Sequence, residues 1–576
     1  MPDDSNAPDW GDYEGADEPS LVPFSTLAVE GIVPLGYDRE AYYYLSRARR
    51  QIVAITSREH SKNSLMNLAS MAHYWQRSRF VNAKGAINWD EAADWLMTSC
   101  RAIGLFDPDR LRGRGAWLDD GKTVLHLGDR LVVDGVEMPV GDVPGSHHIY
   151  EVGLSMGGID VGNPLPSADA RRLIDLCCAC PFEDPESMGR LLAGWLVIAS
   201  VCGAMPWRPH LWVSGENGTG KSWLIDNVIR PIVGKTAIRV SSKTTEAGVR
   251  GTIGVDARPV LFDEAESQNE TDRARMQQVL DLARQASSED GADIVKGTQT
   301  GGVRRYRIRS CFMFSSINLG LTQAADESRT AILITRLDES PILRAEAFAR
   351  LQKIHAEVIT PDFSERLLAR TLRLLPVIRH NAEVFASAIA RSGKTRRMGD
   401  TIGVLLAGAW SLRSNRAATS EEVDEFLAGT PWVQAALEGS STDPEWTRAM
   451  SFLMQQKLRV VSSNGRPEDI PIGELIAGQI GRQGDFSVGI ADGATALSRA
   501  GIKMVMDTFS STHVAFANTS HFIAEAFAQT PWGGSWKATL SRIPGSQKHA
   551  KSIRFGSLVS KAITVPIEFF TSDLGE

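Results

Sequence analysis

The segment 211–225 limits the possible folds of this chain more than any other segment does. Residues 215–222 in it have the spacing G-x-x-x-x-G-K-S. The apolar run Leu211–Val213 before this loop predicts a buried strand, and the amphipathic run Trp223–Ile229 after it predicts a helix. A strand, a glycine loop and a helix in this order direct main-chain N–H groups and a helix N-terminus toward phosphate groups. The segment therefore predicts a phosphate-binding P-loop in an α/β fold; a glycine-rich turn that matches by chance is the competing interpretation.

The P-loop pattern also predicts the ligands. The residues expected to bind the nucleotide are Gly215, Glu216, Asn217, Gly218, Thr219, Gly220, Lys221 and Ser222. Lys221 would reach the β- and γ-phosphates, and the Ser222 hydroxyl would ligate Mg²⁺. The expected cofactors are therefore ATP and Mg²⁺.

A second apolar run, Val260–Phe262, ends in two acidic residues, Asp263 and Glu264. Nucleotide sites of α/β sheets lie at the carboxyl ends of such strands. Asp263 is predicted to lie beside the Mg²⁺, as in a Walker B strand, and Glu264 to orient the attacking water. The alternative is an ordinary solvated strand end.

A third apolar run, Cys311–Asn318, predicts another central strand, which ends in small polar residues. Ser316 or Asn318 could hold the lytic water opposite Glu264, and Asn318 is favoured.

Arg329 precedes a last apolar run, Ala331–Ile334. We expect it to act as an arginine finger across a subunit boundary. The alternative is a surface ion pair with Asp326 or Glu327.

Two extended runs, 294–298 and 303–309, lie between the Asp-Glu strand and the third strand. They predict a hairpin that turns at Gln299–Gly302. Lys296, Arg304 and Arg305 are the candidate DNA contacts, which would follow a phosphate backbone without reading bases. A two-residue period would also place Arg307 and Arg309 on the face of Arg305. The alternatives for these cations are inter-subunit contacts, nucleotide contacts or a solvated strand face.

The order of P-loop, Asp-Glu strand, polar-ended strand and arginine resembles an AAA+ ATPase. More narrowly, it resembles the superfamily 3 helicase modules of phage, prophage and plasmid replication proteins. The segments Thr244–Arg250, Val260–Glu266 and Ala286–Ala292 carry this resemblance, which covers residues 205–340 well. It implies a catalytic set of Lys221, Asp263, Glu264, Asn318 and Arg329.

The same resemblance implies the biological setting. It implies a homo-oligomeric ring, a hexamer, that translocates 3′ to 5′ on single-stranded DNA and unwinds forked duplex in the cytoplasm of a bacterial host. In superfamily 3 hexamers a hairpin before the third strand projects into the central pore. No primase motif is recognisable, so priming would need a separate primase. Two other functions stay open: an AAA+ DNA-binding initiator or loader that does not unwind processively, and a protein-remodelling ATPase.

Composition limits these hypotheses. The 576 residues carry a net charge of −7, so DNA binding would need local positive patches instead of a global field. The most apolar stretch, Leu191–Met205, is too short to span a bilayer, and the acidic N-terminus is no secretory signal. Cys177, Cys178 and Cys180 lack a second pair at metal spacing, which favours buried thiols over a zinc site.

The chain divides by pattern into several parts. The predicted parts are an acidic disordered tail (1–25), an N-terminal α+β domain (26–160), a helical collar (161–204), an AAA+ ATPase core (205–340), a helical lid (341–440) and a C-terminal winged-helix-like domain (441–576). Among the predicted elements are strands at 41–45 and 51–55, helices at 64–75, 89–103, 168–178, 185–200, 363–378, 382–390 and 446–458, and an extended run at 562–570.

Two clusters outside the core combine positive charge with aromatic rings. One is Arg110, Arg112 and Arg114 with Trp117, and the other contains Trp532, Trp536, Lys537, Arg542, Lys548, Lys551 and Arg554. Each is a candidate nucleic-acid or partner surface. A solvated loop and a folded capping domain are the respective alternatives.

Overall fold

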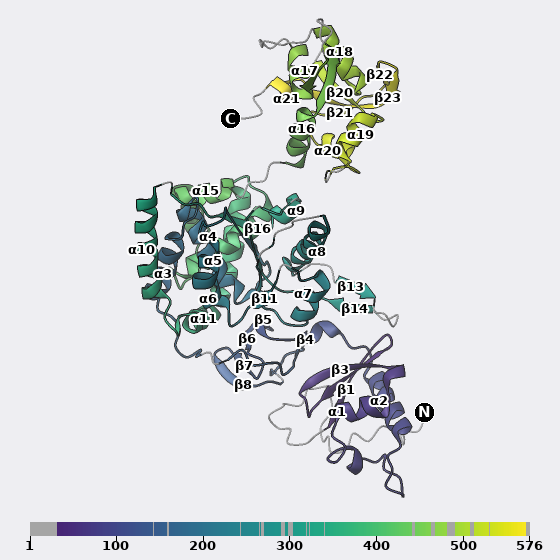
Figure 1. Cartoon of the computed structure of the whole chain (residues 1–576). Coiled ribbons are helices and arrows are strands. Elements are labelled where there is room, and N and C mark those ends of the chain that lie inside the picture. The colour runs from purple at the N-terminus through teal and green to yellow at the C-terminus, as the bar shows by residue number, and fades with distance from the viewer. Residues whose placement is uncertain are drawn as a thin grey trace. The chain divides into compact units, whose positions relative to one another are not determined.

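The computed structural model describes residues 31–141, 143–157, 160–241, 243–263, 265, 270–289, 294–297, 303–317, 319–321, 323–338, 340–439, 444–461, 467–480, 490–506, 512–528, 530 and 532–571 (Figure 1). The predicted tail 1–25 lies outside these residues. The chain forms two compact units, one of residues 1–321 and 325–440 and one of residues 322–324 and 441–576. The domain boundaries predicted inside the first unit stay predictions.

The first unit begins with a three-stranded antiparallel sheet and its helices. The elements are β1 (Ile32–Asp38), β2 (Ala41–Ser46), β3 (Gln51–Thr56), α1 (Lys62–Leu68) and α2 (Trp89–Ile103). Tyr44, Trp75 and Leu96 are fully buried in the core between them. The structure agrees with the predicted β2, β3 and α2, whereas the helix predicted at 64–75 ends at Leu68.

Short strands then lead into the rest of the unit. They are β4 (Leu111–Arg112), β5 (Gly115–Asp119), β6 (Lys122–His126), β7 (Arg130–Val133), β8 (Val136–Pro139) and β9 (Ile149–Tyr150). The arginines of the first basic cluster, at 110–114, make contacts within the fold. Arg112 is buried with its guanidinium 4.6 Å from the Trp117 ring, and Arg114 forms a 2.6 Å ion pair with Asp256. These arginines already have partners, so this cluster is not a free nucleic-acid surface.

A five-stranded parallel sheet forms the centre of the unit. Its strands are β10 (His210–Ser214), β11 (Ile238–Val240), β12 (Val260–Phe262), β15 (Phe312–Ser316) and β16 (Thr330–Ile334), in the order β11-β12-β15-β10-β16. Along β10, the side chains of Leu211 and Val213 pack in one hydrophobic core, and the side chain of Trp212 packs in another. Both faces are therefore buried, which explains the continuous apolar runs in the sequence.

Helices pack against the sheet and form a large helical layer beside it. Those near the sheet are α5 (Lys221–Leu224), a π-helical turn (Ile225–Ile229), α6 (Arg230–Val233), α7 (Glu246–Ile253), α8 (Glu270–Ala286) and α9 (Ala324–Glu327). The layer comprises α3 (Ser167–Cys178), α4 (Pro185–Ala199), α10 (Pro341–Val358), α11 (Phe363–Arg391), α12 (Arg396–Met398), a π-helical turn (Gly399–Gly403), α13 (Val404–Ser411), α14 (Ser420–Gly429) and α15 (Pro431–Gly439). A Cβ on Gly194 would lie 2.0 Å from the carbonyl oxygen of Leu405, so α4 and α13 pack this closely only because residue 194 is glycine.

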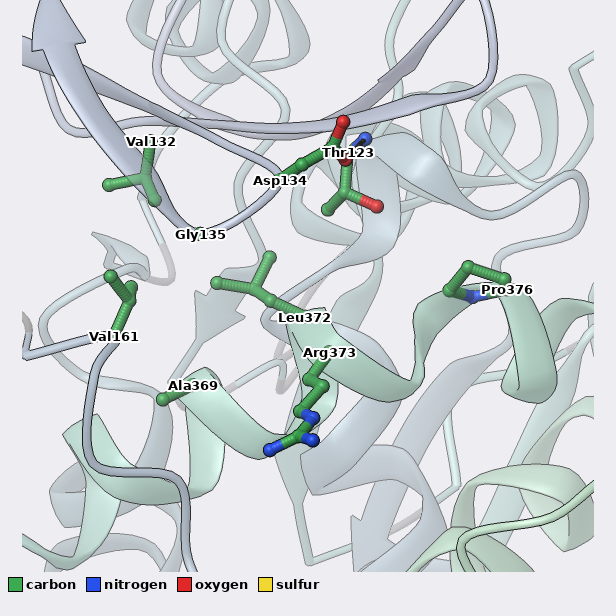
Figure 2. A pocket seen from close by; sticks show the side chains of 9 residues that line it. All are labelled: Thr123, Val132, Asp134, Gly135, Val161, Ala369, Leu372, Arg373 and Pro376. Atoms are coloured by element: carbon green, nitrogen blue, oxygen red, sulfur yellow. Dashed lines mark hydrogen bonds between the residues drawn. The ribbon is translucent and has the colours of Figure 1, made fainter.

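Helix α11 corrects one prediction and borders a cavity. It runs unbroken through the two helices predicted at 363–378 and 382–390, with Pro376 in its interior. Pro376 cannot donate a main-chain hydrogen bond to Leu372, and both residues line a cavity of about 360 Å³ against β6 and β7 (Figure 2). Asp134 in this cavity accepts a hydrogen bond from the N–H of Thr123 at 2.9 Å. Part of the polar lining of the cavity is therefore already hydrogen-bonded within the protein.

The second unit combines helices with a four-stranded sheet of order β19-β20-β24-β21. Its helices are α16 (Glu445–Gln455), α17 (Ile472–Gln479), α18 (Ile490–Arg499), α19 (His521–Phe527), α20 (Trp536–Leu540) and α21 (Glu568–Thr571). Its strands are β17 (Lys457–Val461), β18 (Pro467–Pro471), β19 (Ile502–Met506), β20 (Thr512–Ala517), β21 (Gln547–Lys548), β22 (Ile553–Phe555), β23 (Leu558–Ser560) and β24 (Ala562–Pro566).

Three sequence expectations change in this unit. The extended run predicted at 562–570 ends at Pro566, where α21 follows, and the helix predicted at 446–458 ends at Gln455. Trp536 is 3% exposed and stacks on Phe527, so this aromatic ring belongs to the core and is not a binding surface. The winged-helix assignment stays a prediction.

Candidate active site

The segment predicted to be a P-loop folds as strand, loop and helix. Strand β10 ends at Ser214, the loop spans 215–220, and a continuous helical segment begins at Lys221. Gly220, just before this helix, has the left-handed φ of 93°, which glycine adopts without strain. A Cβ on Gly215 would lie 2.2 Å from the Thr335 hydroxyl oxygen. The loop glycines therefore permit close main-chain contacts that other residues would block.

The loop is fastened to the end of β16. Thr219 is buried, and its hydroxyl lies 2.7 Å from that of Thr335, whose N–H donates to the Ser214 carbonyl at 2.7 Å. Arg336 follows with an exposed side chain, and its main-chain N–H donates to the carbonyl of Pro181. Thr335 and Arg336 are not among the predicted site residues, although they follow an apolar strand as Asp263 does.

Lys221 lies at the start of the helix, and its ammonium group contacts the loop. Its Nζ donates to the carbonyls of Gly215 and Glu216, the latter at 2.8 Å. Ser222 beside it is exposed. The ammonium group and the hydroxyl are therefore both within one helical turn of the loop main chain.

Asp263 directly follows β12 at the same edge of the sheet. Its N–H donates to the Val240 carbonyl at 3.4 Å, and its carboxylate accepts a 3.1 Å ion pair from Arg230. Two residues on, the N–H of Ala265 donates to the Ser315 carbonyl at 2.7 Å. Glu264 lies outside the described residues, but its two neighbours are fixed at the carboxyl ends of β11 and β15.

The end of β15 lies beside the P-loop strand. The Ser214 hydroxyl donates to the Ile317 carbonyl at 2.9 Å. Ser316 is buried, and its hydroxyl accepts the indole N–H of Trp212 at 2.8 Å, so it does not face the edge of the sheet. Asn318 lies outside the described residues. Of the two residues considered for the lytic water, Asn318 therefore stays the candidate.

These residues fit ATP and Mg²⁺. Mg²⁺ prefers oxygen ligands, and the exposed Ser222 hydroxyl and the half-exposed Asp263 carboxylate are such donors. A Cβ on Gly218 would meet no atom within 4 Å, so the outer side of the loop is open. Bound Mg²⁺ would neutralise charge on the β- and γ-phosphates, while Lys221 and the loop main chain would hold them.

Arg329 lies at the opposite edge of the sheet. It precedes β16, and its carbonyl accepts the N–H of His210 where β10 begins. The strand between the two edges has five residues, which separates Arg329 from the P-loop edge by roughly 16 Å. Arg329 therefore does not reach the predicted P-loop of the same chain.

The surroundings of Arg329 are positively charged. Burial, together with the nearby charges of Arg397 and Arg284, lowers its pKa to about 10. Its Nε is buried without a hydrogen-bond partner in the described part of the chain, and Nη1 donates to the Ala325 carbonyl at 2.6 Å. Asp326 instead accepts Arg284 at 2.9 Å. The ion pair with Asp326 that we considered as an alternative is thus not formed.

The predicted hairpin is present in the backbone. Strands β13 (Ile294–Gly297) and β14 (Val303–Tyr306) pair antiparallel, with Lys296 opposite Arg304 and Val295 opposite Arg305. The turn predicted at Gln299–Gly302, like the side chains of Lys296, Arg304 and Arg305, lies outside what the structure describes.

Arg307 and Arg309 do not continue the strand. Arg307 pairs with Asp109 at 3.2 Å, and Arg309 is 5% exposed and pairs with Glu289 at 2.8 Å. Because their charges are already matched by carboxylates, these two arginines fasten the base of the hairpin and do not share a free cationic face with Arg305.

Strand β10 is held by a buried histidine that predicts acid sensitivity. His210 accepts the N–H of Phe312 at 3.1 Å, and its other ring nitrogen lies 2.7 Å from the Ala283 carbonyl. Burial lowers the pKa of His210 to about 3. The folded protein therefore keeps this ring neutral at pH values where the unfolded chain, with a pKa near 6.5, binds a proton.

Acidification should consequently destabilise the fold. Between pH 6.5 and pH 5 we expect His210 to reduce the free energy of unfolding by about 2 kcal/mol. Urea unfolding monitored by tryptophan fluorescence at several pH values measures this. His210→Gln should be less stable at pH 7.5 but lose less stability on acidification, and an equal loss in both proteins would contradict the assignment.

The described residues show neither a cluster of metal ligands nor a membrane-spanning helix. Among them no group of three or more His, Cys, Asp and Glu residues is arranged to hold a metal ion. Cys177 and Cys180 are buried, and burial raises the pKa of the Cys180 thiol to about 12. Within the same residues, no helix is both long and apolar enough to cross a membrane.

Comparison with known proteins adds little to this geometry. No protein-family model matches the chain, and no curated protein matches it. Three solved structures of the NrS-1 C-terminal region resemble it weakly, at 12–13% identity and TM-scores of 0.28–0.34. These alignments cover 77–93% of this chain and 96% of each of those chains. Any functional assignment must therefore come from the site itself.

Proposed function

We propose that this chain is an ATP-dependent, ring-forming DNA helicase of a phage or mobile-element replication system. The observation that carries the proposal is the meeting of three segments at one edge of a parallel sheet: the P-loop, Asp263 and the end of β15. From β10 the chain crosses to β11 at the far edge, returns through β12 and β15, and then places β16 on the other side of β10. Ligands of α/β sheets bind where strand order reverses in this way.

In this proposal each residue at the edge has a separate task. Main-chain N–H groups of the loop and Lys221 hold the phosphates, while Ser222 and Asp263 hold Mg²⁺. Glu264 and Asn318 orient the attacking water from opposite sides. Arg329 of a neighbouring subunit stabilises the charge that develops on the transferred phosphoryl group.

The position of Arg329 favours a ring. A finger that acts between subunits must face away from the P-loop of its own subunit, and Arg329 lies at the opposite edge of the sheet. Its buried, partnerless Nε and its arginine neighbours would gain an anionic partner at such an interface. Hydrolysis would then depend on assembly.

The hairpin supports DNA as the polymer that the ring moves along. Its register sets Lys296 opposite Arg304, and like charges in directly opposed positions destabilise a strand pair unless an anion lies between them. A phosphate backbone supplies such anions.

Removing these two cations tests the role of the hairpin. We expect Lys296→Ala with Arg304→Ala to weaken binding of single-stranded DNA at least about tenfold and to reduce the slope of log affinity against log salt by about 0.7 for each phosphate that is no longer neutralised. Fluorescence anisotropy with a labelled oligonucleotide measures both. The matched control removes two exposed cations of α10, Arg350 and Lys353, and should leave affinity and slope unchanged. Equal effects of both pairs would refute specific binding by the hairpin.

Strand displacement on a forked duplex tests the function itself. A helicase shows ATP-dependent displacement and hydrolysis that single-stranded DNA stimulates. Hydrolysis and ring assembly without displacement would favour an initiator or loader. Hydrolysis that DNA does not stimulate would favour a protein-remodelling ATPase.

A further inference from the structure

The predicted Mg²⁺ ligand Asp263 already has a cationic partner within the chain. Arg230 Nη2 lies 3.1 Å from Asp263 Oδ2, and Arg230 Nη1 also contacts Oδ1 of Asp226 one helical turn earlier. Arg230, Asp263 and Ile225 line a cavity of about 430 Å³ between the P-loop helix and the ends of β11 and β12. A single guanidinium thus joins the P-loop helix to the end of β12.

A local irregularity in the helix accounts for this contact. Pro231 has no N–H to donate to the carbonyl of Asn227, which instead accepts a 2.9 Å hydrogen bond from His355. The preceding turn, Ile225–Ile229, is π-helical and holds about one extra residue. One extra residue rotates every later side chain by about 100° around the helix axis. We attribute the direction of Arg230, toward β12, to this turn.

We infer that Arg230 is a positioning residue that competes with Mg²⁺ for Asp263 and thereby sets the Mg²⁺ concentration at which nucleotide binds. The inference rests on the proposed function. Its basis is electrostatic: a fixed positive charge in contact with a carboxylate weakens the binding of a second cation to the same oxygens. Arg230 and Asp263 are 27% and 47% exposed, so their ion pair is weak enough for Mg²⁺ to displace it.

Asp226 determines how strongly Arg230 competes. The Asp226 carboxylate contacts the same guanidinium group and partly neutralises its charge, so it weakens the attraction between Arg230 and Asp263. The structure therefore predicts opposite effects for two substitutions. Loss of the charge at Arg230 should ease Mg²⁺ binding, and loss of the charge at Asp226 should hinder it.

The test is equilibrium binding of a fluorescent, non-hydrolysable ATP analogue to the full-length protein during a Mg²⁺ titration. Arg230→Gln should lower the half-saturating Mg²⁺ concentration by about three- to tenfold, and Arg230→Lys, which keeps the charge, should stay within about twofold of the wild type. Asp226→Asn should raise it by about two- to threefold. Circular dichroism confirms folding, and if Arg230→Gln does not fold, Asp226→Asn tests the inference in the opposite direction.

The outcomes separate this inference from the proposed function. If the wild type binds the analogue with a Mg²⁺ requirement that Arg230→Gln leaves unchanged or raises, the inference is wrong and the nucleotide site stands. If Asp226→Asn fails to raise the requirement, the shared-charge argument is wrong. If the wild type binds no analogue, or Asp263→Asn has the same Mg²⁺ requirement as the wild type, the proposed site itself is wrong.

Discussion

Replacement of Lys221 by alanine is expected to abolish ATP hydrolysis. The Lys221 ammonium group lies against the main chain of the loop, where its Nζ contacts the carbonyls of Gly215 and Glu216. With ATP bound, the ammonium group would turn to the β- and γ-phosphates and stabilise the charge that develops during transfer. Removing one such preorganised group costs about 10²–10³-fold in turnover, so the rate should fall to background.

The control for Lys221→Ala is a lysine of the same unit with another partner. Lys235 pairs with Glu365 away from the loop, so Lys235→Ala should keep wild-type hydrolysis. Phosphate release by both variants is compared after their melting temperatures are shown to match that of the wild type. Wild-type turnover in Lys221→Ala would refute the site assignment.

Arg329→Ala should reduce hydrolysis by about 10³-fold or more while each subunit still binds nucleotide. Arg329 lies at the sheet edge opposite the P-loop, so its loss leaves the binding residues in place. Lysine should not substitute for it, because an ammonium group lacks the planar fork that binds two phosphate oxygens together.

Mixing the two inactive variants distinguishes a finger from a structural arginine. In mixed rings, some intact P-loops of Arg329→Ala subunits would face the intact Arg329 of Lys221→Ala subunits, so hydrolysis should reappear. Arg336 supplies the contrast, since it lies beside the P-loop of its own subunit. Any loss of activity in Arg336→Ala should not be rescued by Lys221→Ala. If mixing does not restore hydrolysis for Arg329→Ala, Arg329 has a structural role only.

Patterns of neighbouring residues correctly predicted those parts of the site that a single segment of the chain forms. The strand before the P-loop, the helix after it and the strand that delivers Asp263 lie where apolar runs and glycines indicated. These features depend on the geometry of neighbouring residues, which the sequence contains directly.

Features that depend on distant residues could not be predicted in this way. Arg112 and Trp117 looked like an exposed basic and aromatic cluster, yet contacts with residues far along the chain bury both. The contact of Arg230 with Asp263 depends on a π-helical turn, and no local signal shows which way that turn rotates Arg230. The pairing of Asp326 with Arg284, which leaves Arg329 without Asp326 as an ion-pair partner, likewise joins residues 42 positions apart.

In the proposed mechanism, loop amides and Lys221 hold ATP, and a neighbouring copy of the chain helps to hydrolyse it. The most direct test measures ATP turnover per subunit at increasing protein concentration, with particle mass recorded in parallel. We expect turnover per subunit to rise with ring assembly and then to reach a plateau. A protein that stays monomeric and binds no ATP, or whose turnover per subunit is constant at all concentrations, would refute this mechanism.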